Sequence, residues 1–287
     1  MKLYNLIAAA ALAVAIVPSA QAADLTGTLA KIDKSGEIVI GHRESSVPFA
    51  YLDSNQNPIG YSMDLCAKVV EAVSAELGKK LTVKYVPVNP KTRIALMANG
   101  TIDLECGSTT NNLTRQQQVE YLPVTFVTGT KLMVRKGSGI SSVKDLNGKA
   151  VALAQGTTNE RAVKAAGKEL GIEFKVLPVR DHAEGMLSLE TDRVDAYATD
   201  HILLFGLISK SKNPDQFEVV GDFLSFDPYA LMVRRDDSAF ELIGKKTLAA
   251  VFRSGEINAI YEKWFSPLGV PQTDLLKAAF QLGALPE

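Results

Sequence analysis

Polar side chains that can hold a small charged molecule recur where strands and helices of this chain are expected to end. A guanidinium presents N–H donors in a planar fork that matches a carboxylate, and the free N–H groups at a helix start favour an anion. The residues concerned are Arg43, Arg93, Ser108, Thr109, Thr110, Thr157, Thr158 and Asp200. Each also has an ordinary structural use, as a surface or ion-paired arginine, a turn hydroxyl or a helix cap, and spacing alone leaves both interpretations open.

Motifs for catalysis and metal binding are absent from the sequence. It has no Gly-x-Ser-x-Gly elbow and no phosphate-binding Walker loop. The three histidines, His42, His182 and His201, are scattered, and no Cys-x-x-Cys occurs, so a metal site is not expected. Glu44 and Glu160 are the acidic candidates for a general acid or base, and each has a plain surface or helix-start interpretation. The sequence therefore favours binding without catalysis or cofactor.

Alternating strand and helix patterns must position these side chains. Apolar residues three and four apart predict a helix over 62–77, with Ser62 capping its start. The patterns also predict strands over 37–41, 81–88, 102–106, 150–154, 174–178 and 194–198. Further helices are expected over 91–98, 159–170, 182–190 and most of 238–265, with another opening at Asp200. This alternation indicates an α/β fold built on parallel sheet.

Two successive α/β runs predict two lobes. Residues 121–136 and 217–234 are strand-rich stretches, so the chain is expected to leave the first lobe, build the second and return. This gives a first lobe of 23–126 and 227–287 and a second lobe of 127–226. Crossings near 125–130 and 223–229 would then form a hinge, with a cleft for a small molecule between the lobes.

The first 22 residues have the pattern of a secretory signal peptide. A charged start, an apolar run over 6–17 and small residues at Ala20 and Ala22 predict cleavage after Ala22. The run is shorter than the roughly 20 residues that span a bilayer. Export places the mature chain in an oxidising compartment, the periplasm, where Cys66 and Cys106 either pair or remain thiols. Nothing in the sequence decides between these two states.

Composition and charge exclude other classes of protein. Lys plus Arg total 31 and Asp plus Glu total 32, for a formal net charge of −1, so no basic field for nucleic acid is expected. The hydrophobic share of 46% is too high for a disordered chain. Two cysteines are too few for a disulfide-stapled mini-protein.

Several motifs together are similar to one family. They are GHRESSVPF over 41–49, GYSMD over 60–64, RIAL over 93–96, ECGSTTNN over 105–112, GTT over 156–158, RDH over 180–182 and the stretch ending at Asp200. Across the whole mature chain they resemble the periplasmic solute-binding proteins of polar amino-acid ABC importers, and most closely the glutamate/aspartate-binding branch. The resemblance implies the two-lobed, type II periplasmic-binding-protein fold, which closes on its ligand.

The resemblance also implies a ligand set. Arg93 clamps the ligand α-carboxylate, Ser108, Thr110 and Thr158 complete that pocket, Asp200 accepts the α-ammonium, and Arg43 and His182 face the ligand side chain. Related binders of neutral or basic amino acids often carry an acidic residue in place of Arg43. A cation at this position attracts a side-chain carboxylate and repels an ammonium group.

The sequence departs from the family pattern at two places. Pro90 stands where the branch often has a serine, which removes a hydroxyl contact. Leu231 stands where a cysteine often pairs with the cysteine of the Glu-Cys-Gly-Ser motif, so only Cys66 could pair with Cys106. The Pro90 change concerns affinity and fine specificity more than ligand class.

The implied function is binding of glutamate or aspartate by a monomer, and delivery to a membrane ABC permease by closure of the cleft. No nucleic-acid partner is expected. One alternative is a binder of another polar amino acid, such as glutamine, asparagine or cystine. An alternative of a different class is a periplasmic enzyme on the same scaffold, for example a dehydratase of cyclic dicarboxylates, which would need a general acid or base in the cleft.

Overall fold

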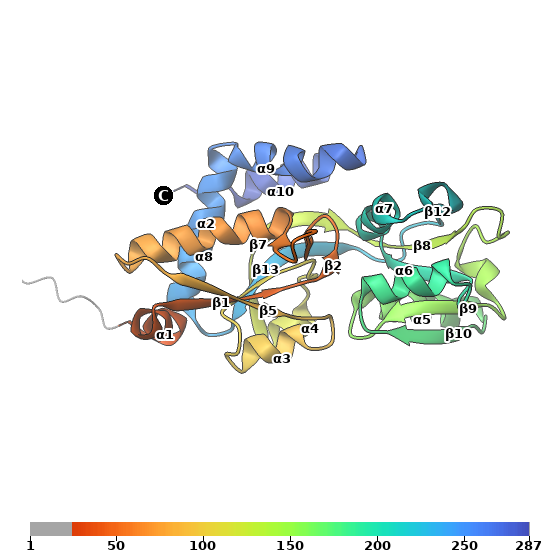
Figure 1. Ribbon diagram of the computed structural model, residues 1–287, viewed down its shortest axis with the longest axis horizontal. Coiled ribbons are helices and arrows are strands. Elements are labelled where there is room, and N and C mark those ends of the chain that lie inside the picture. The colour runs from red at the N-terminus through yellow and green to blue at the C-terminus, as the bar shows by residue number, and fades with distance from the viewer. Residues whose placement is uncertain (1–24, 287) are drawn as a thin grey trace, which may run out of the picture.

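The chain folds into two lobes that lie side by side along the long axis of the molecule (Figure 1). The structure is a computed structural model, and it describes residues 25–286. The predicted signal peptide and its cleavage site therefore lie outside the described residues. Each lobe contains a five-stranded sheet with its own helices and its own buried apolar clusters. The α/β, two-lobed architecture expected from the sequence is confirmed.

The first sheet has the strand order β5-β1-β6-β13-β7. Its strands are β1 (Glu37–His42), β5 (Thr82–Pro87), β6 (Leu104–Cys106), β7 (Val119–Thr128) and β13 (Asp227–Arg234). Strands β5, β1 and β6 are parallel, and β13 runs antiparallel to both β6 and β7. The helices of this lobe are α1 (Gly27–Ser35), α2 (Tyr61–Glu76), α3 (Arg93–Ala98), α4 (Leu113–Gln116), α8 (Ser238–Arg253), α9 (Glu256–Phe265) and α10 (Asp274–Gly283). A small sheet of β2 (Ser45–Ser46), β3 (Ala50–Leu52) and β4 (Pro58–Ile59) lies next to them.

The second sheet has the order β10-β9-β11-β8-β12. Its strands are β8 (Thr130–Arg135), β9 (Ala150–Ala154), β10 (Lys175–Val179), β11 (Ala196–Asp200) and β12 (Phe217–Val220), and its helices are α5 (Thr158–Leu170), α6 (His182–Glu190) and α7 (His201–Lys210). Strands β10, β9 and β11 are parallel, whereas β8 pairs antiparallel to both β11 and β12. Parallel strands bring their carboxyl ends to one edge, so β9 and β11 both end toward the first lobe, where α5 and α7 begin.

Two short segments join the lobes. Strand β7 of the first sheet ends at Thr128, and β8 of the second begins at Thr130, so Gly129 alone separates them. The return passes through 221–226, between β12 and β13. A Cβ added to Gly129 would lie 2.1 Å from the Ser225 carbonyl oxygen, so the two crossings run against each other and only glycine fits between them.

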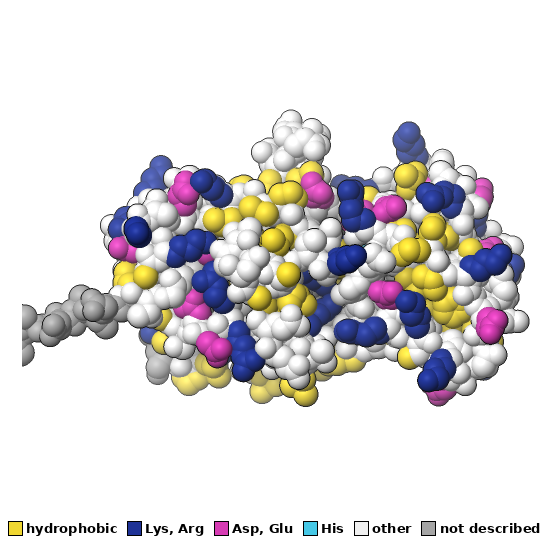
Figure 2. Space-filling view, turned by 90° about the horizontal axis from the view of Figure 1, so that it is seen from below, with side chains coloured by type: hydrophobic (Ala, Val, Ile, Leu, Met, Phe, Trp, Pro, Cys, Tyr) yellow, Lys and Arg dark blue, Asp and Glu magenta, His cyan; other side chains and the backbone are white. Residues whose placement is uncertain are grey.

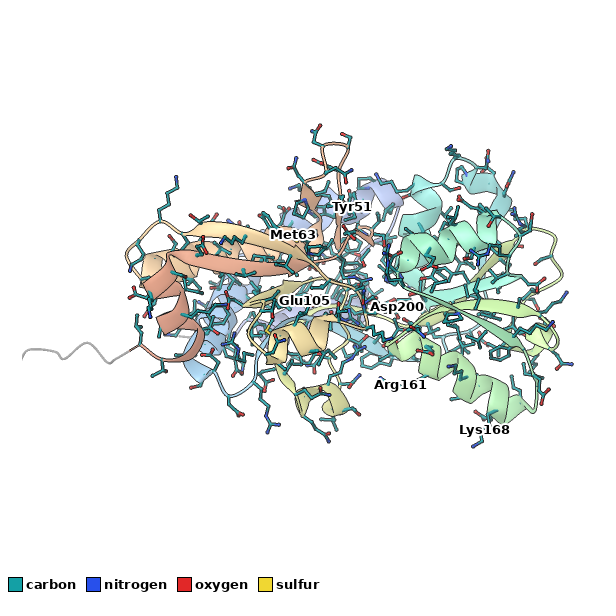
Figure 3. All side chains as sticks on the ribbon, turned by 60° about the horizontal axis from the view of Figure 1, so that its bottom comes forward. Tyr51, Met63, Glu105, Arg161, Lys168 and Asp200 are labelled. Atoms are coloured by element: carbon teal, nitrogen blue, oxygen red, sulfur yellow. A yellow bond between two sulfur atoms is a disulfide. The ribbon has the colours of Figure 1, made fainter. Side chains whose placement is uncertain are left out.

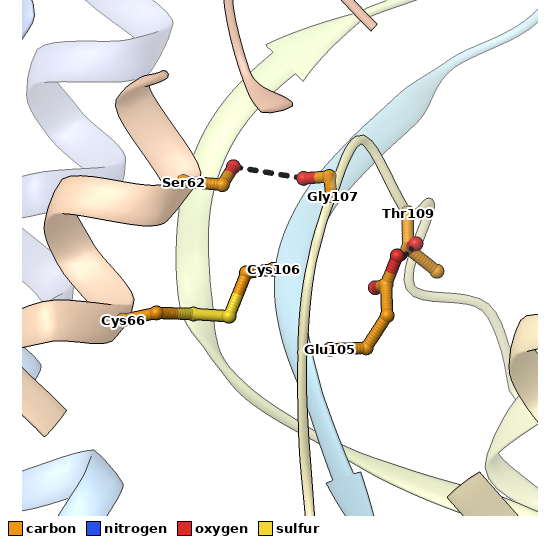
Figure 4. Close-up of a disulfide and its surroundings, with 6 residues drawn as sticks. All are labelled: Ser62, Cys66, Glu105, Cys106, Gly107 and Thr109. Carbon is orange, nitrogen blue, oxygen red and sulfur yellow. Dashed lines mark hydrogen bonds between the residues drawn. A yellow bond between two sulfur atoms is a disulfide. The ribbon is translucent and has the colours of Figure 1, made fainter. Parts of the chain in front are cut away.

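The two cysteines form a disulfide between α2 and β6. The Cα atoms of Cys66 and Cys106 lie 6.2 Å apart, and the bond holds β6 and the loop after it against α2 (Figure 4). The sequence left this pairing open. The predicted cap of α2 is wrong, because the Ser62 hydroxyl donates to the Gly107 carbonyl at 2.8 Å instead of bonding the start of its own helix. Within residues 25–286, no helix has both the length and the apolar character needed to cross a membrane.

Candidate functional site

Arg93 is the first residue of α3, and its guanidinium is held by the loop that follows β6. The side chain is buried, and its Nη1 donates to the Ser108 carbonyl at 3.2 Å and to the Thr109 hydroxyl at 2.6 Å. That hydroxyl donates in turn to Glu105 Oε2 at 2.7 Å. Two groups of this region, Arg93 Nε and the Ser108 hydroxyl, are buried and have no hydrogen-bond partner among the described residues.

Arg43 follows β1 and is the largest fully buried side chain among the described residues. Burial and the positive charge of Arg93 lower the pKa of Arg43 from 12.5 to about 10, against the opposing attraction of Glu105. Its Nη2 has no hydrogen-bond partner within residues 25–286. The structure therefore buries two guanidinium groups near one carboxylate, which leaves this part of the interior electropositive.

Asp200 ends β11 at the junction of the lobes, as Figure 3 shows. Its carboxylate accepts a hydrogen bond from Asn159 Nδ2 at 3.0 Å and another from the hydroxyl of Tyr229, which lies on β13 of the first sheet. Burial and the neighbouring Asp227 raise the pKa of Asp200 to about 8. The backbone of Asp200 occupies the N-cap position of α7, but its side chain makes no capping bond there. Of the two interpretations that the sequence allowed, a helix cap or a ligand contact, the cap is not observed.

Hydroxyl groups from both lobes meet beside Asp227. Thr110, in the loop after β6, donates to Asp227 Oδ1 at 2.9 Å, and its hydroxyl lies 3.3 Å from that of Thr158 at the start of α5. Thr157 caps that helix, since its hydroxyl accepts the Glu160 N–H at 3.0 Å. Thr157 is thus a helix cap, while the hydroxyl of Thr158 contacts the other lobe.

Arg115 bridges the lobes beside these hydroxyls. It lies on α4, is buried, and donates to the Thr110 carbonyl at 2.7 Å and to the Gly156 carbonyl of the second lobe at 3.2 Å. Elsewhere between the lobes the Ala183 N–H of α6 donates to the Ser45 hydroxyl of β2 at 3.3 Å. Direct hydrogen bonds therefore join the lobes at more than one place.

His182 is the first residue of α6 and faces the first lobe from the second. It is buried, and its Nδ1 lies 2.7 Å from the Tyr197 hydroxyl. Burial, followed by the positive charges of Arg43 and Arg93, holds the pKa of His182 well below its usual range. The ring is thus neutral at physiological pH. When Tyr197 donates to Nδ1, the proton of the ring is on Nε2, which can then donate to another group.

A small cavity opens between the lobes next to Arg43. Its volume is about 170 Å³. It is lined by Arg43, Glu44, Ser45, Pro87, Val88, Asn89, Arg180 and Asp181. Lys and Arg side chains, with a few Asp and Glu among them, lie around the middle of the face that Figure 2 shows. The lining of the cavity itself combines two arginines with Glu44 and Asp181.

The predicted residues fall into two groups. Arg43, Arg93, Ser108 and Thr110 lie in the first lobe, and Thr158, His182 and Asp200 lie in the second, all on the side facing the other lobe. The structure brings Thr110 to Thr158, and the charge of Arg43 acts on His182. Asp200 and Arg93 share no hydrogen bond within the described residues: Arg93 bonds Ser108 and Thr109, and Asp200 bonds Asn159 and Tyr229.

Sequence reasoning missed several residues of this region. They are Glu105, Arg115, Asn159, Asp227 and Tyr229. Glu105 stands inside a motif that had been singled out, and a charged residue between Leu104 and Cys106 on a central strand is a signal of a buried polar contact. Each of the other four has a side-chain partner at least 29 positions away, and their only local side-chain bonds among the described residues are Arg115 to the Thr110 carbonyl and Ser225 to Asp227, so no local pattern predicts the distant contacts.

The two acidic residues considered for acid–base catalysis lie in different surroundings. Glu44 is exposed at the rim. Glu160 accepts the Gly156 N–H at 3.1 Å and pairs with Lys164 at 2.7 Å, one turn along α5. Among residues 25–286, no three His, Cys, Asp or Glu side chains are grouped so that they could hold a metal ion.

Two lobes that meet at a junction of buried charged side chains of both signs are the arrangement of a ligand-binding protein of the bacterial solute-binding type. Residues 38–267 match the family described as bacterial extracellular solute-binding proteins, family 3, and the chain belongs to that family. It is therefore a binding protein and not an enzyme.

Two relatives found by sequence have names that specify a ligand, which the family description does not. The chain is 43% identical over 264 residues to the L-glutamate/L-aspartate-binding protein of Pseudomonas aeruginosa, covering 91% of this chain and 87% of the relative. It is 42% identical over 261 residues to the glutamate/aspartate import solute-binding protein of Escherichia coli K12, with coverages of 90% and 86%. Among solved structures, an ancestral arginine-binding protein bound to glutamine has a TM-score of 0.71 at 29% identity, covering 80% of this chain and 98% of that one.

Proposed function

We propose that this protein binds L-glutamate and L-aspartate between its lobes and delivers them to an ABC import permease in the membrane. The named functions of the relatives at 42% and 43% identity support this ligand class. The observation that carries the proposal is Arg43, a guanidinium that is 1% exposed, lies near a second arginine and has one Nη group without a partner among the described residues. A buried cation with an unused donor is matched by an anionic side chain.

The ligand is oriented by its three charged groups. Arg93, with Ser108, Thr110 and Thr158, binds the α-carboxylate through a guanidinium fork and hydroxyl donors. Asp200 accepts the α-ammonium. Arg43 binds the side-chain carboxylate, and His182 donates to the same group from Nε2 while Tyr197 fixes Nδ1. Glutamine fits the first two sites but brings no charge to Arg43, so it is bound more weakly.

Binding closes the lobes. The first lobe comprises residues 23–126 and 227–287, and the second comprises 127–226. A ligand that touches Arg93 in one lobe and Asp200 in the other favours the form in which both are near it, and so shifts the population toward closure. The two crossings, where Gly129 passes the Ser225 carbonyl, act as the hinge.

The mature protein acts in the periplasm. The family is described as extracellular, which agrees with export. Cleavage after Ala22 leaves a chain that begins at Ala23, and intact-mass measurement of the protein purified from the periplasm gives the N-terminus directly. A mass that retains residues 1–22 contradicts cleavage.

A thermal-shift screen of the mature protein with the twenty amino acids, followed by calorimetry on those that stabilise it, tests the ligand class. Glutamate and aspartate are expected to raise the unfolding midpoint most, because a ligand that binds only the folded state stabilises it. If glutamine, asparagine or cystine gives the largest shift, the protein is instead a binder of another polar amino acid. If no amino acid shifts the midpoint, the proposal fails.

A further inference from the structure

A chain of three side chains holds Arg93 in place. Arg93 Nη1 donates to Thr109 Oγ1 at 2.6 Å, and Thr109 Oγ1 donates its own proton to Glu105 Oε2 at 2.7 Å (Figure 4 shows the second contact). A hydroxyl has one proton, so by giving it to Glu105 the oxygen keeps its lone pairs for Arg93. The carboxylate polarises the hydroxyl and strengthens its bond to the guanidinium.

This arrangement determines which edge of the guanidinium is free. Nη1 carries two N–H groups, and the Ser108 carbonyl and the Thr109 hydroxyl occupy both. Nε is buried and has no partner among the described residues. The edge formed by Nε and Nη2 is therefore the one that can bind both oxygens of a carboxylate.

The position of Glu105 is itself built into the fold. It is fully buried on β6 in the first lobe (Figure 3). A Cβ on Gly107 would lie 2.3 Å from Glu105 Oε1 and 2.9 Å from Arg43 Cγ, so this glycine leaves room for the carboxylate and for the Arg43 side chain. The neighbouring Cys106 ties the strand to α2 through the disulfide. Strand, disulfide and glycine together fix the acceptor for Thr109.

We propose that Thr109 and Glu105 are positioning residues that orient Arg93, so that its Nε–Nη2 edge meets the α-carboxylate of the ligand. This inference rests on the proposed function. Because every amino acid has an α-carboxylate, this relay from Glu105 through Thr109 to Arg93 contributes equally to the binding of all ligands. It contributes to affinity and leaves the choice between acidic and neutral side chains to Arg43.

Calorimetry with glutamate, aspartate and glutamine on Thr109→Val tests the relay. Loss of one hydrogen bond to a charged group lowers the affinity for each ligand by about ten- to a hundredfold, with the ratios between ligands unchanged. Thr109→Ser keeps the hydroxyl and retains affinity within about threefold of the original protein. If Thr109→Val does not fold, Thr109→Ala replaces it.

A double-mutant cycle separates positioning from a general structural effect. In an Arg93→Lys background there is no guanidinium to orient, so adding Thr109→Val is expected to lower ligand affinity less than about threefold. If Thr109→Val lowers affinity by the same factor in this background as in the original protein, the relay is wrong. Glutamine, whose side chain is uncharged, tests Glu105 with little interference from charge. Glu105→Gln keeps an oxygen acceptor for Thr109 and retains glutamine binding within about threefold, whereas Glu105→Met weakens it to the level of Thr109→Val.

The two hypotheses fail in different ways. If the unaltered protein binds no amino acid, the proposed function is wrong. If it binds them and Thr109→Val binds them as tightly, the function stands and the relay is wrong.

Discussion

Replacing Arg43 by methionine separates ligand recognition from stability, because the same buried charge affects the two in opposite directions. Burial and Arg93 lower the pKa of Arg43 from 12.5 to about 10. At about 1.4 kcal/mol for each pKa unit, the charged form is disfavoured in this environment by ~3 kcal/mol. A ligand carboxylate supplies the missing counter-charge and recovers an energy of this order.

The expected loss of affinity follows from that figure. Truncating one partner of a buried charge pair costs about 2–5 kcal/mol, and ~3 kcal/mol corresponds to about a hundredfold weaker binding of glutamate and aspartate. Glutamine brings no charge to this position and is expected to lose less than about tenfold. Without ligand, Arg43→Met removes an incompletely paired buried charge and stabilises the protein by about 1–3 kcal/mol, which raises the unfolding midpoint by several degrees.

Calorimetry with the three ligands and thermal unfolding without ligand measure both effects. Arg180→Met is the matched control, because Arg180 lines the same cavity but its side chain is 72% exposed and paired with Asp181. It should leave affinity and midpoint almost unchanged. Equal losses for glutamate and glutamine would refute the role of Arg43, and a lower midpoint for Arg43→Met would refute the energetic reasoning.

Three further predictions concern the rest of the site. Arg93→Met weakens glutamate, aspartate and glutamine alike in calorimetry, since all carry an α-carboxylate; an effect confined to acidic ligands would exchange the roles of the two arginines. Replacing both Cys66 and Cys106 by serine removes the disulfide, which closes a loop of 40 residues. Because the open chain gains entropy when unfolded, the free energy of unfolding measured by urea titration is expected to fall by about 4 kcal/mol. No change would show that the bond does not constrain the unfolded chain. The raised pKa of Asp200, about 8, means that the folded protein keeps a proton that the unfolded chain releases near pH 4, so ligand-free stability falls as pH rises from about 4 to about 8. Asp200→Asn is expected to remove that slope. In the proposed site the ligand ammonium pairs with the ionised carboxylate, so affinity is expected to rise between about pH 6 and 8, with proton release detected by calorimetry in buffers of different ionisation enthalpy.

Elements with strong local patterns were predicted closely. Helix α6 begins at His182 and ends at Glu190 as expected, because Asp181 accepts the Glu184 N–H at 3.0 Å and caps its start. Strand β9 also has the expected bounds, Ala150–Ala154. Both depend on neighbours within a few positions, which a sequence displays directly.

The polar contacts were less predictable, because each hydroxyl or carboxylate had more than one partner to choose from. Ser62 bonds Gly107 rather than its own helix, since α2 is packed against the loop after β6. Asp200 bonds Tyr229 and Asn159 instead of capping α7. A side chain can serve as a cap or as part of a buried network, and the packing of distant segments decides which.

The sequence by itself determined the class of this protein. The order of strands and helices, the two extended crossings and the motifs around Arg43, Arg93 and Ser108 were enough for the two-lobed fold and the solute-binding family. Only the tertiary structure decided how those residues are held: that Cys66 pairs with Cys106, that Glu105 accepts from the Thr109 hydroxyl that binds Arg93, and that both N–H groups of Arg93 Nη1 are occupied while Nε has no partner among the described residues. Burial and hydrogen bonding depend on which segments, distant along the chain, come together in the folded protein. The order of residues in the sequence does not state which segments these are.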